Sequence, residues 1–162
     1  MRPSEREALR ARFGFRCGYC GVSEIDVGAE LTVDHYQPRS RGGGDDPANW
    51  VYSCFTCNNH KGDLWAPHSS QRILHPLYDD LPRQISEEPE GTLTGLTETG
   101  LFHIERLQLN RPALVAHRRS QIRQAELAQR LEELLHQQEG LRHRLEVLEQ
   151  TLIEVERRLT SL

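Results

Sequence analysis

Long apolar segments are missing from this sequence of 162 residues. It has no run of 18 apolar residues that could cross a membrane, and no apolar segment near its beginning that would act as a secretion signal. An excess of basic residues is missing too, since the net charge is −4. We therefore expect a cytoplasmic protein with no membrane partner, in which contact with nucleic acid depends on a local basic patch.

Cysteine is scarce, and its four copies form two C-x-x-C pairs. Cys17 and Cys20 lie in CGYC, and Cys54 and Cys57 lie in CFTC, with 33 residues between the pairs. In a reducing compartment such cysteines bind a metal more often than they form disulfides. Two C-x-x-C turns supply four thiolates to one tetrahedral ion and leave no open coordination position. The sequence predicts one structural Zn²⁺, in preference to unrelated buried thiols or a redox-active pair.

The segment between the cysteine pairs contains polar groups of a catalytic kind. A strand is predicted in LTVDHYQP, which contains Asp34 and His35, and a glycine-rich loop follows in RSRGGGDDPA. A second strand is predicted in NWVYSC, which begins at Asn49, and a helix in FTCNNHKGDLW. Taken alone, the first strand and its loop could equally be an exposed hairpin with a surface histidine. The zinc site would bring the two ends of residues 17–57 together.

In their order and spacing these motifs resemble the HNH endonucleases, whose ββα-metal fold is a hairpin followed by a helix. The resemblance covers about residues 12–65, through C-x-x-C, D-H-x-x-P-x-S-x-G-G, an asparagine before the second strand, and C-x-x-C-N-x-x-K. It implies a metal-dependent endonuclease that hydrolyses phosphodiester bonds. We expect DNA as the substrate and a role in restriction, anti-phage defence or the upkeep of mobile DNA.

The resemblance also implies roles for single residues. His35 would be the general base that takes the proton from the attacking water. Asp34 and Asn58 would give hard oxygen ligands to Mg²⁺ or Mn²⁺ at the scissile phosphate. Asn49 would hold the hairpin and the histidine in place.

The third letter of the HNH pattern is an asparagine here, Asn58, which favours magnesium over a metal that prefers nitrogen ligands. His60 is the alternative, but a shift of two positions turns a side chain most of the way round a helix. Lys61, the only lysine in the sequence, stands at the lysine position of the motif and would contact phosphate. Arg39 and Arg41 would contact the backbone phosphates as well, unless they are solvated surface residues.

The sequence as a whole suggests three domains, of which the first, residues 1–66, contains the cysteine pairs and the hairpin and is called the finger below. SEREALRARFG predicts a short first helix with a capping box that starts at Ser4. Residues 67–111 are rich in proline, glycine and polar residues, and predict a loop-rich extension. Its polar residues His75, Asp79 and Asp80 could approach the hairpin, although surface positions suit them better.

Residues 112–162 differ in character from the rest. No proline follows Pro112, and leucine-type residues recur at alternating steps of four and three from Leu127 to Leu162, with Gln138 in the one vacant position. This heptad pattern predicts one long helix, although Gly140 could mark a bend. The apolar stripe in residues 127–162 needs a partner, which we expect to be a second copy of the chain or another protein.

The sequence as a whole predicts an α+β fold, a small zinc-stapled ββα-metal finger followed by a long C-terminal coiled-coil helix. Two other functions remain open beside the endonuclease. One is a zinc-stabilised module that binds nucleic acid without cutting it. The other is a nuclease subunit that a larger complex recruits through the coiled coil.

Overall fold

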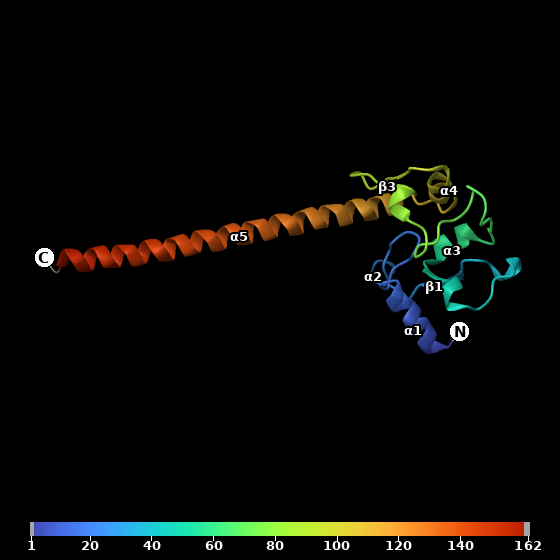
Figure 1. Cartoon of the computed structure of the whole chain (residues 1–162), viewed down its shortest axis with the longest axis horizontal. Helices are drawn as coiled ribbons and strands as arrows, with labels where there is room; N and C mark the ends of the chain where they lie inside the picture. Colours follow the sequence, from blue (N-terminus) through green and yellow to red (C-terminus); the bar gives the residue numbers. More distant parts are fainter. Residues whose placement is uncertain (1, 161–162) are drawn as a thin grey trace. The chain divides into compact units, whose positions relative to one another are not determined.

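The computed structural model describes residues 2–160 and divides into two compact units, residues 1–119 and residues 120–162. Figure 1 shows the helices and strands coloured in chain order, and their bounds are α1 (Pro3–Arg12), α2 (Glu24–Val27), β1 (Thr32–His35), β2 (Trp50–Ser53), α3 (Phe55–Lys61), β3 (Ile85–Glu87), β4 (Leu93–Gly95), α4 (Glu98–Arg106) and α5 (Pro112–Thr160). Three short 3₁₀ turns accompany them, η1 (Arg39–Arg41), η2 (Pro47–Asn49) and η3 (Leu81–Arg83).

The centre of the first unit is the predicted hairpin and helix. Strands β1 and β2 pair antiparallel, with Asp34 opposite Val51 and His35 opposite Trp50. Every residue of β2 is buried. Helix α3 begins directly after β2, at Phe55, and packs on β1. The predicted order of strand, loop, strand and helix is confirmed.

Helix α1 begins one residue earlier than the predicted cap. Pro3 is its first residue, a position where proline is favoured because its fixed φ suits a helix and its missing N–H has no partner to lose. The carboxylate of Glu5 accepts from the backbone N–H of Arg2 at 2.6 Å, so the reciprocal contact involves Arg2 and Glu5 rather than Ser4. Leu9 on this helix is buried in the core.

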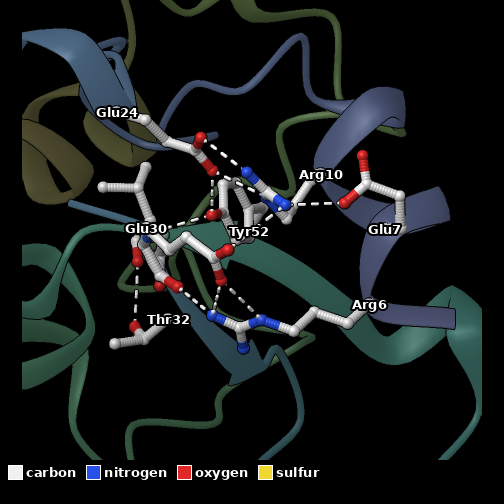
Figure 2. Close-up of polar contacts among 9 residues, drawn as sticks. Arg6, Glu7, Arg10, Glu24, Glu30, Thr32 and Tyr52 are labelled. Atoms are coloured by element: carbon white, nitrogen blue, oxygen red, sulfur yellow. Dashed lines mark hydrogen bonds and ion pairs between the residues drawn. The ribbon is translucent and has the colours of Figure 1, made fainter. Parts of the chain in front are cut away.

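A network of polar contacts ties α1 to α2 and to the hairpin (Figure 2). Arg10 donates two hydrogen bonds of 2.8 Å to the carboxylate of Glu24, and the Tyr52 hydroxyl donates to the same carboxylate. These contacts, Arg10 first, lower the pKa of Glu24 to about 2. Arg6 donates to the backbone carbonyl of Leu31 at 2.8 Å, just before β1. The first helix thus holds the start of β1 from the outside.

The extension after the finger is more ordered than its composition suggests. Strands β3 and β4 form a second antiparallel hairpin, α4 follows, and the buried side chains of Leu74, Ile104, Leu107 and Leu109 belong to the same compact unit as β2. In Figure 1, α3 lies between β1 and α4. A finger of this size buries little apolar surface by itself, so these side chains enlarge its core.

Helix α5 confirms the predicted long helix and continues through Gly140 without a break. Its first residues belong to the first unit, where Leu114 and Arg118 are buried. In the second unit the leucine-type residues of the heptad pattern from Leu127 to Val155 are 47–64% exposed. Leu162 lies outside the described residues. None of the described helices is long and apolar enough to span a membrane.

Candidate metal centre and active site

The four cysteines converge on one point, as their spacing predicts. All four sulfur atoms lie within 4.8 Å of one another, and the Sγ atoms of Cys20 and Cys54 are 3.7 Å apart. None of the four forms a disulfide. Four sulfurs at about 2.3 Å from a tetrahedral zinc ion would be about 3.8 Å apart, so the cluster fits structural Zn²⁺.

Short-range hydrogen bonds build the two turns that hold these sulfurs. In the first turn the N–H of Gly21 donates to the carbonyl of Cys17 at 2.9 Å, and in the second the N–H of Cys57 donates to the sulfur of Cys54 at 3.4 Å. Arg111, which follows α4, places Nη2 3.9 Å from the sulfur of Cys57. Its positive charge compensates part of the negative charge of four thiolates. No motif around Arg111 predicted this role.

Asp34 lies inside the first unit, paired with two side chains from other elements. One oxygen accepts from the Tyr19 hydroxyl at 2.6 Å and the other accepts from Lys61 Nζ at 2.9 Å. The side chains of Lys61 and Asp34 are only 1% and 5% exposed. Burial raises the pKa of the Asp34 carboxyl, against the opposing effects of the Lys61 ammonium and the Tyr19 hydroxyl. Tyr19 stands between two cysteines of the cluster and therefore links the metal centre to Asp34.

The placement of Lys61 corrects the expected phosphate contact. Its ammonium donates to Asp34 and also to the backbone carbonyl of His35 at 2.9 Å. The lysine is buried and does not reach the surface. The apolar stem of Lys61 spans the distance from α3 to β1, and its ammonium is a cation in the interior of the unit. It fixes the backbone at His35 and balances the charge of Asp34.

Asn58 contacts β1 two residues before Asp34. Its Nδ2 donates to the Thr32 hydroxyl at 3.3 Å, and Thr32 and Asp34 share one face of β1, just as Asn58 and Lys61 share one face of α3. The side-chain oxygen of Asn58 accepts no hydrogen bond from the described residues. Each oxygen of Asp34 keeps a second lone pair beside its one donor. The two residues therefore offer the hard oxygens that fit Mg²⁺.

His60 is directed to another part of the unit. Its Nδ1 lies 3.0 Å from the backbone carbonyl of Leu107, which makes this nitrogen a donor and ties α3 to the end of α4. This contact supports Asn58 over His60 as the third residue of the pattern.

His35 stands at the end of β1 with its ring partly exposed. Its Nε2 lies 2.7 Å from the carboxylate of Asp45, in the loop between β1 and β2. Arg39 donates to both oxygens of this carboxylate, at 2.5 and 2.8 Å. These contacts, with Arg39 first, lower the pKa of Asp45 to about 2. Sequence reasoning named His35 and Arg39 but missed Asp45.

Asn49 closes the loop that contains these residues. Its side-chain oxygen accepts from the N–H of Gln37 at 2.7 Å, and its Nδ2 donates to the carbonyls of Gln37 and Gly44 at 3.0 Å. Gly43 passes so close that an added Cβ would lie 1.8 Å from the Gln37 carbonyl oxygen. Asn49, at the end of the loop, is thus bonded to Gln37 at its start, two residues after His35.

Of the three polar residues that the extension offered, Asp79 packs within it, whereas His75 packs partly on the finger, and the expected surface position is wrong for His75. His75 is buried against Tyr36 and Tyr78, and burial lowers its pKa to about 4. Asp79 forms two hydrogen bonds of 2.7 Å with Arg72. The third, Asp80, is exposed. Among these side chains the structure gives no contact with the carboxylate of Asp34 or the ring of His35.

Together, hairpin, helix and four-cysteine cluster define a small ββα finger with a cluster that fits zinc, and with a histidine and a buried carboxylate at its first strand. The family model for HNH endonucleases matches residues 17–64, and this part of the chain is an HNH endonuclease domain. The resemblance seen in the motifs is thereby confirmed. Searches of curated proteins and of solved structures give no match.

Proposed function

We propose that the chain is a metal-dependent endonuclease that hydrolyses phosphodiester bonds in DNA. The observation that carries the proposal is the group of His35, Asp34 and Asn58, which belong to β1 and α3 of an HNH domain. A module that only binds nucleic acid has no need for a general base beside hard oxygen ligands. Restriction, anti-phage defence or the upkeep of mobile DNA in the cytoplasm is the setting we infer.

In this proposal each residue has one task. His35 takes the proton from the attacking water, while Asp34 and Asn58 hold Mg²⁺ or Mn²⁺. The ion supplies positive charge at the scissile phosphate. Arg39 and Arg41, both exposed in the loop that follows His35, contact the neighbouring phosphates. Lys61 keeps Asp34 in place from the inside.

His35→Ala tests the proposal. We expect cleavage of plasmid DNA by zinc-loaded protein with Mg²⁺, and a loss of about 10²–10⁴-fold in the variant, which is the usual contribution of a general base. The matched control is His68→Ala, which removes an exposed histidine of the extension and should leave cleavage unchanged. Zinc content and folding should equal wild type in both variants.

Two results would contradict this assignment. Near-native cleavage by His35→Ala would exclude His35 as the base. Binding of DNA without cleavage in any divalent metal would favour the binding module, or a nuclease that cuts only after recruitment to a larger complex. Parallel assays on single-stranded DNA and RNA would define the substrate.

We also infer that α5 pairs with a second copy of the chain. Its heptad stripe exposes leucines that are each worth about 1.5–3 kcal/mol when buried. With Leu131 at position a, Gln138 occupies a further a position, which favours a defined register. Arg144 and Glu149 then stand at g and the following e, and neither forms an ion pair within the described chain. In a parallel dimer each could pair with its counterpart.

Leu148→Lys should disrupt this dimer, because it places a charge at a d position of the stripe. We expect a dimer for wild type and a monomer for the variant by light scattering at micromolar concentration. Gln150→Lys is the matched control, since it adds the same charge at position f, away from the stripe, and should remain dimeric. A monomeric wild type would contradict the pairing and leave another protein as the partner.

A further inference from the structure

Asp45 touches the proposed general base although no motif points to it. It lies ten residues after His35, in the loop between β1 and β2, and its Oδ1 is 2.7 Å from His35 Nε2. The backbone of His35 is held as well, because Lys61 donates to its carbonyl and because His35 pairs with Trp50 across the hairpin. The ring is therefore oriented by a carboxylate from one side and by the backbone from the other.

Arg39 determines what Asp45 can offer to the histidine. Its guanidinium donates to both oxygens of Asp45, and these contacts keep the pKa of the carboxyl low, at about 2. An ionised carboxylate only accepts hydrogen bonds. At neutral pH the His35 nitrogen that faces Asp45 must therefore carry the proton, and in the neutral ring the other nitrogen, Nδ1, then has the free lone pair.

Stability alone gives little reason for this arrangement. The side chains of Arg39 and Asp45 are 66% and 55% exposed, and an ion pair this exposed adds little to stability because water screens it. Orientation of the imidazole is a more specific consequence of the same contacts.

We propose that Asp45 is a positioning residue for His35: it holds the proton on Nε2, so that Nδ1 is the atom that accepts the proton of the attacking water. The proposal rests on the proposed function, in which His35 is the general base. Arg39 supports it by fixing the carboxylate. Asp45 itself touches neither the phosphate nor the metal.

Asp45→Asn is the test of this role. Oδ1 of Asp45 contacts both His35 Nε2 and Arg39, and Oδ2 contacts Arg39 as well, so an amide with its single oxygen places an N–H donor against at least one of these donors. The neutral amide is also a weaker acceptor than the carboxylate, so it holds the Nε2 proton and the ring of His35 less firmly. We expect kcat to fall about 10–100-fold with KM within about twofold, a smaller loss than removal of the whole base.

The matched control is Asp46→Asn. It removes the same charge from the adjacent residue, and the amide oxygen can still accept the 2.7 Å hydrogen bond from the N–H of Ala48 that caps η2. Asp46→Asn should keep wild-type kcat and KM. A second readout is the tautomer itself, from the ring ¹⁵N shifts of His35, assigned by comparison with His35→Gln. Wild type and Asp46→Asn should be protonated at Nε2, and Asp45→Asn should show a smaller share of this tautomer.

The outcomes separate this inference from the proposed function. If His35→Ala cleaves DNA normally, the base itself is wrongly assigned. If His35→Ala is inactive while Asp45→Asn matches Asp46→Asn in rate and tautomer, only the role of Asp45 is overturned. Faster cleavage by Asp45→Asn would also overturn it, since Asp45 would then restrain the histidine.

Discussion

Removal of zinc is expected to unfold the first unit, residues 1–119, and to abolish cleavage. Three of the four cysteines, Cys17, Cys54 and Cys57, are buried in the core beside Val51 of β2. Without the metal, four sulfurs within 4.8 Å of one another would be left as crowded thiols or as mutually repelling thiolates. Structural zinc is worth about 10–16 kcal/mol in small fingers, more than or comparable to the 5–15 kcal/mol of a typical domain.

Fluorescence of the two tryptophans, the buried Trp50 and the half-buried Trp65, gives a suitable measurement, because both lie in the first unit, whereas α5 can remain helical and dominate circular dichroism. Chelation should expose Trp50. Added Zn²⁺ should restore the signal, whereas added Mg²⁺ alone should not, which separates the structural ion from the catalytic one. We expect one zinc per chain by metal analysis. Active, unchelated protein without zinc would contradict the assignment of the cluster.

Lys61→Met should destabilise the first unit by about 3–5 kcal/mol, the usual cost of removing one partner from a buried ion pair. Methionine replaces the stem of the lysine but leaves the Asp34 carboxylate, only 5% exposed, without its cation. It also removes the donor to the His35 carbonyl. Urea unfolding of zinc-loaded protein, followed through Trp50, measures the change.

Arg41→Met provides the control for this variant. Arg41 is also a cation of the finger, but it is exposed and only loosely paired with Asp63, at 3.6 Å, so its loss should cost less than about 0.5 kcal/mol. Combining Lys61→Met with Asp34→Asn should cost less than the sum of the two single changes, since the uncompensated charge is then gone. Unchanged stability in Lys61→Met together with weaker DNA binding would restore the surface role that the sequence suggested.

Zinc removal and Lys61→Met both test how so small a core holds the buried carboxylate of Asp34 in place. Tyr19 and Lys61 reach Asp34 from the first cysteine turn and from α3. Because the turn is held by the cysteine cluster, loss of zinc would also loosen the Tyr19 contact. A single side chain, Tyr19, thus connects the cysteine cluster to Asp34, the proposed ligand of the catalytic metal.

Local sequence determined the parts of this protein that depend on spacing along the chain. A C-x-x-C turn brings its two sulfurs together by backbone geometry, and so the spacing of Cys17, Cys20, Cys54 and Cys57 was enough to assign them to one metal. The same holds for the strand and loop around His35 and for the long helix, whose period of leucines is visible in the sequence. The roles of His35, Asp34 and Asn58 came from the family resemblance and remain proposals.

Tertiary structure decided the features that depend on residues far apart in the chain. Lys61 and Asp34 are separated by 27 positions and Arg111 and Cys57 by 54, and only folding brings them together. The contact of Asp45 with His35 depends on how a glycine-rich loop closes, and many closures are compatible with its composition. The extension belongs to the core because its buried Leu107 and Leu109 share one apolar cluster with β2, and composition does not predict such packing between distant segments.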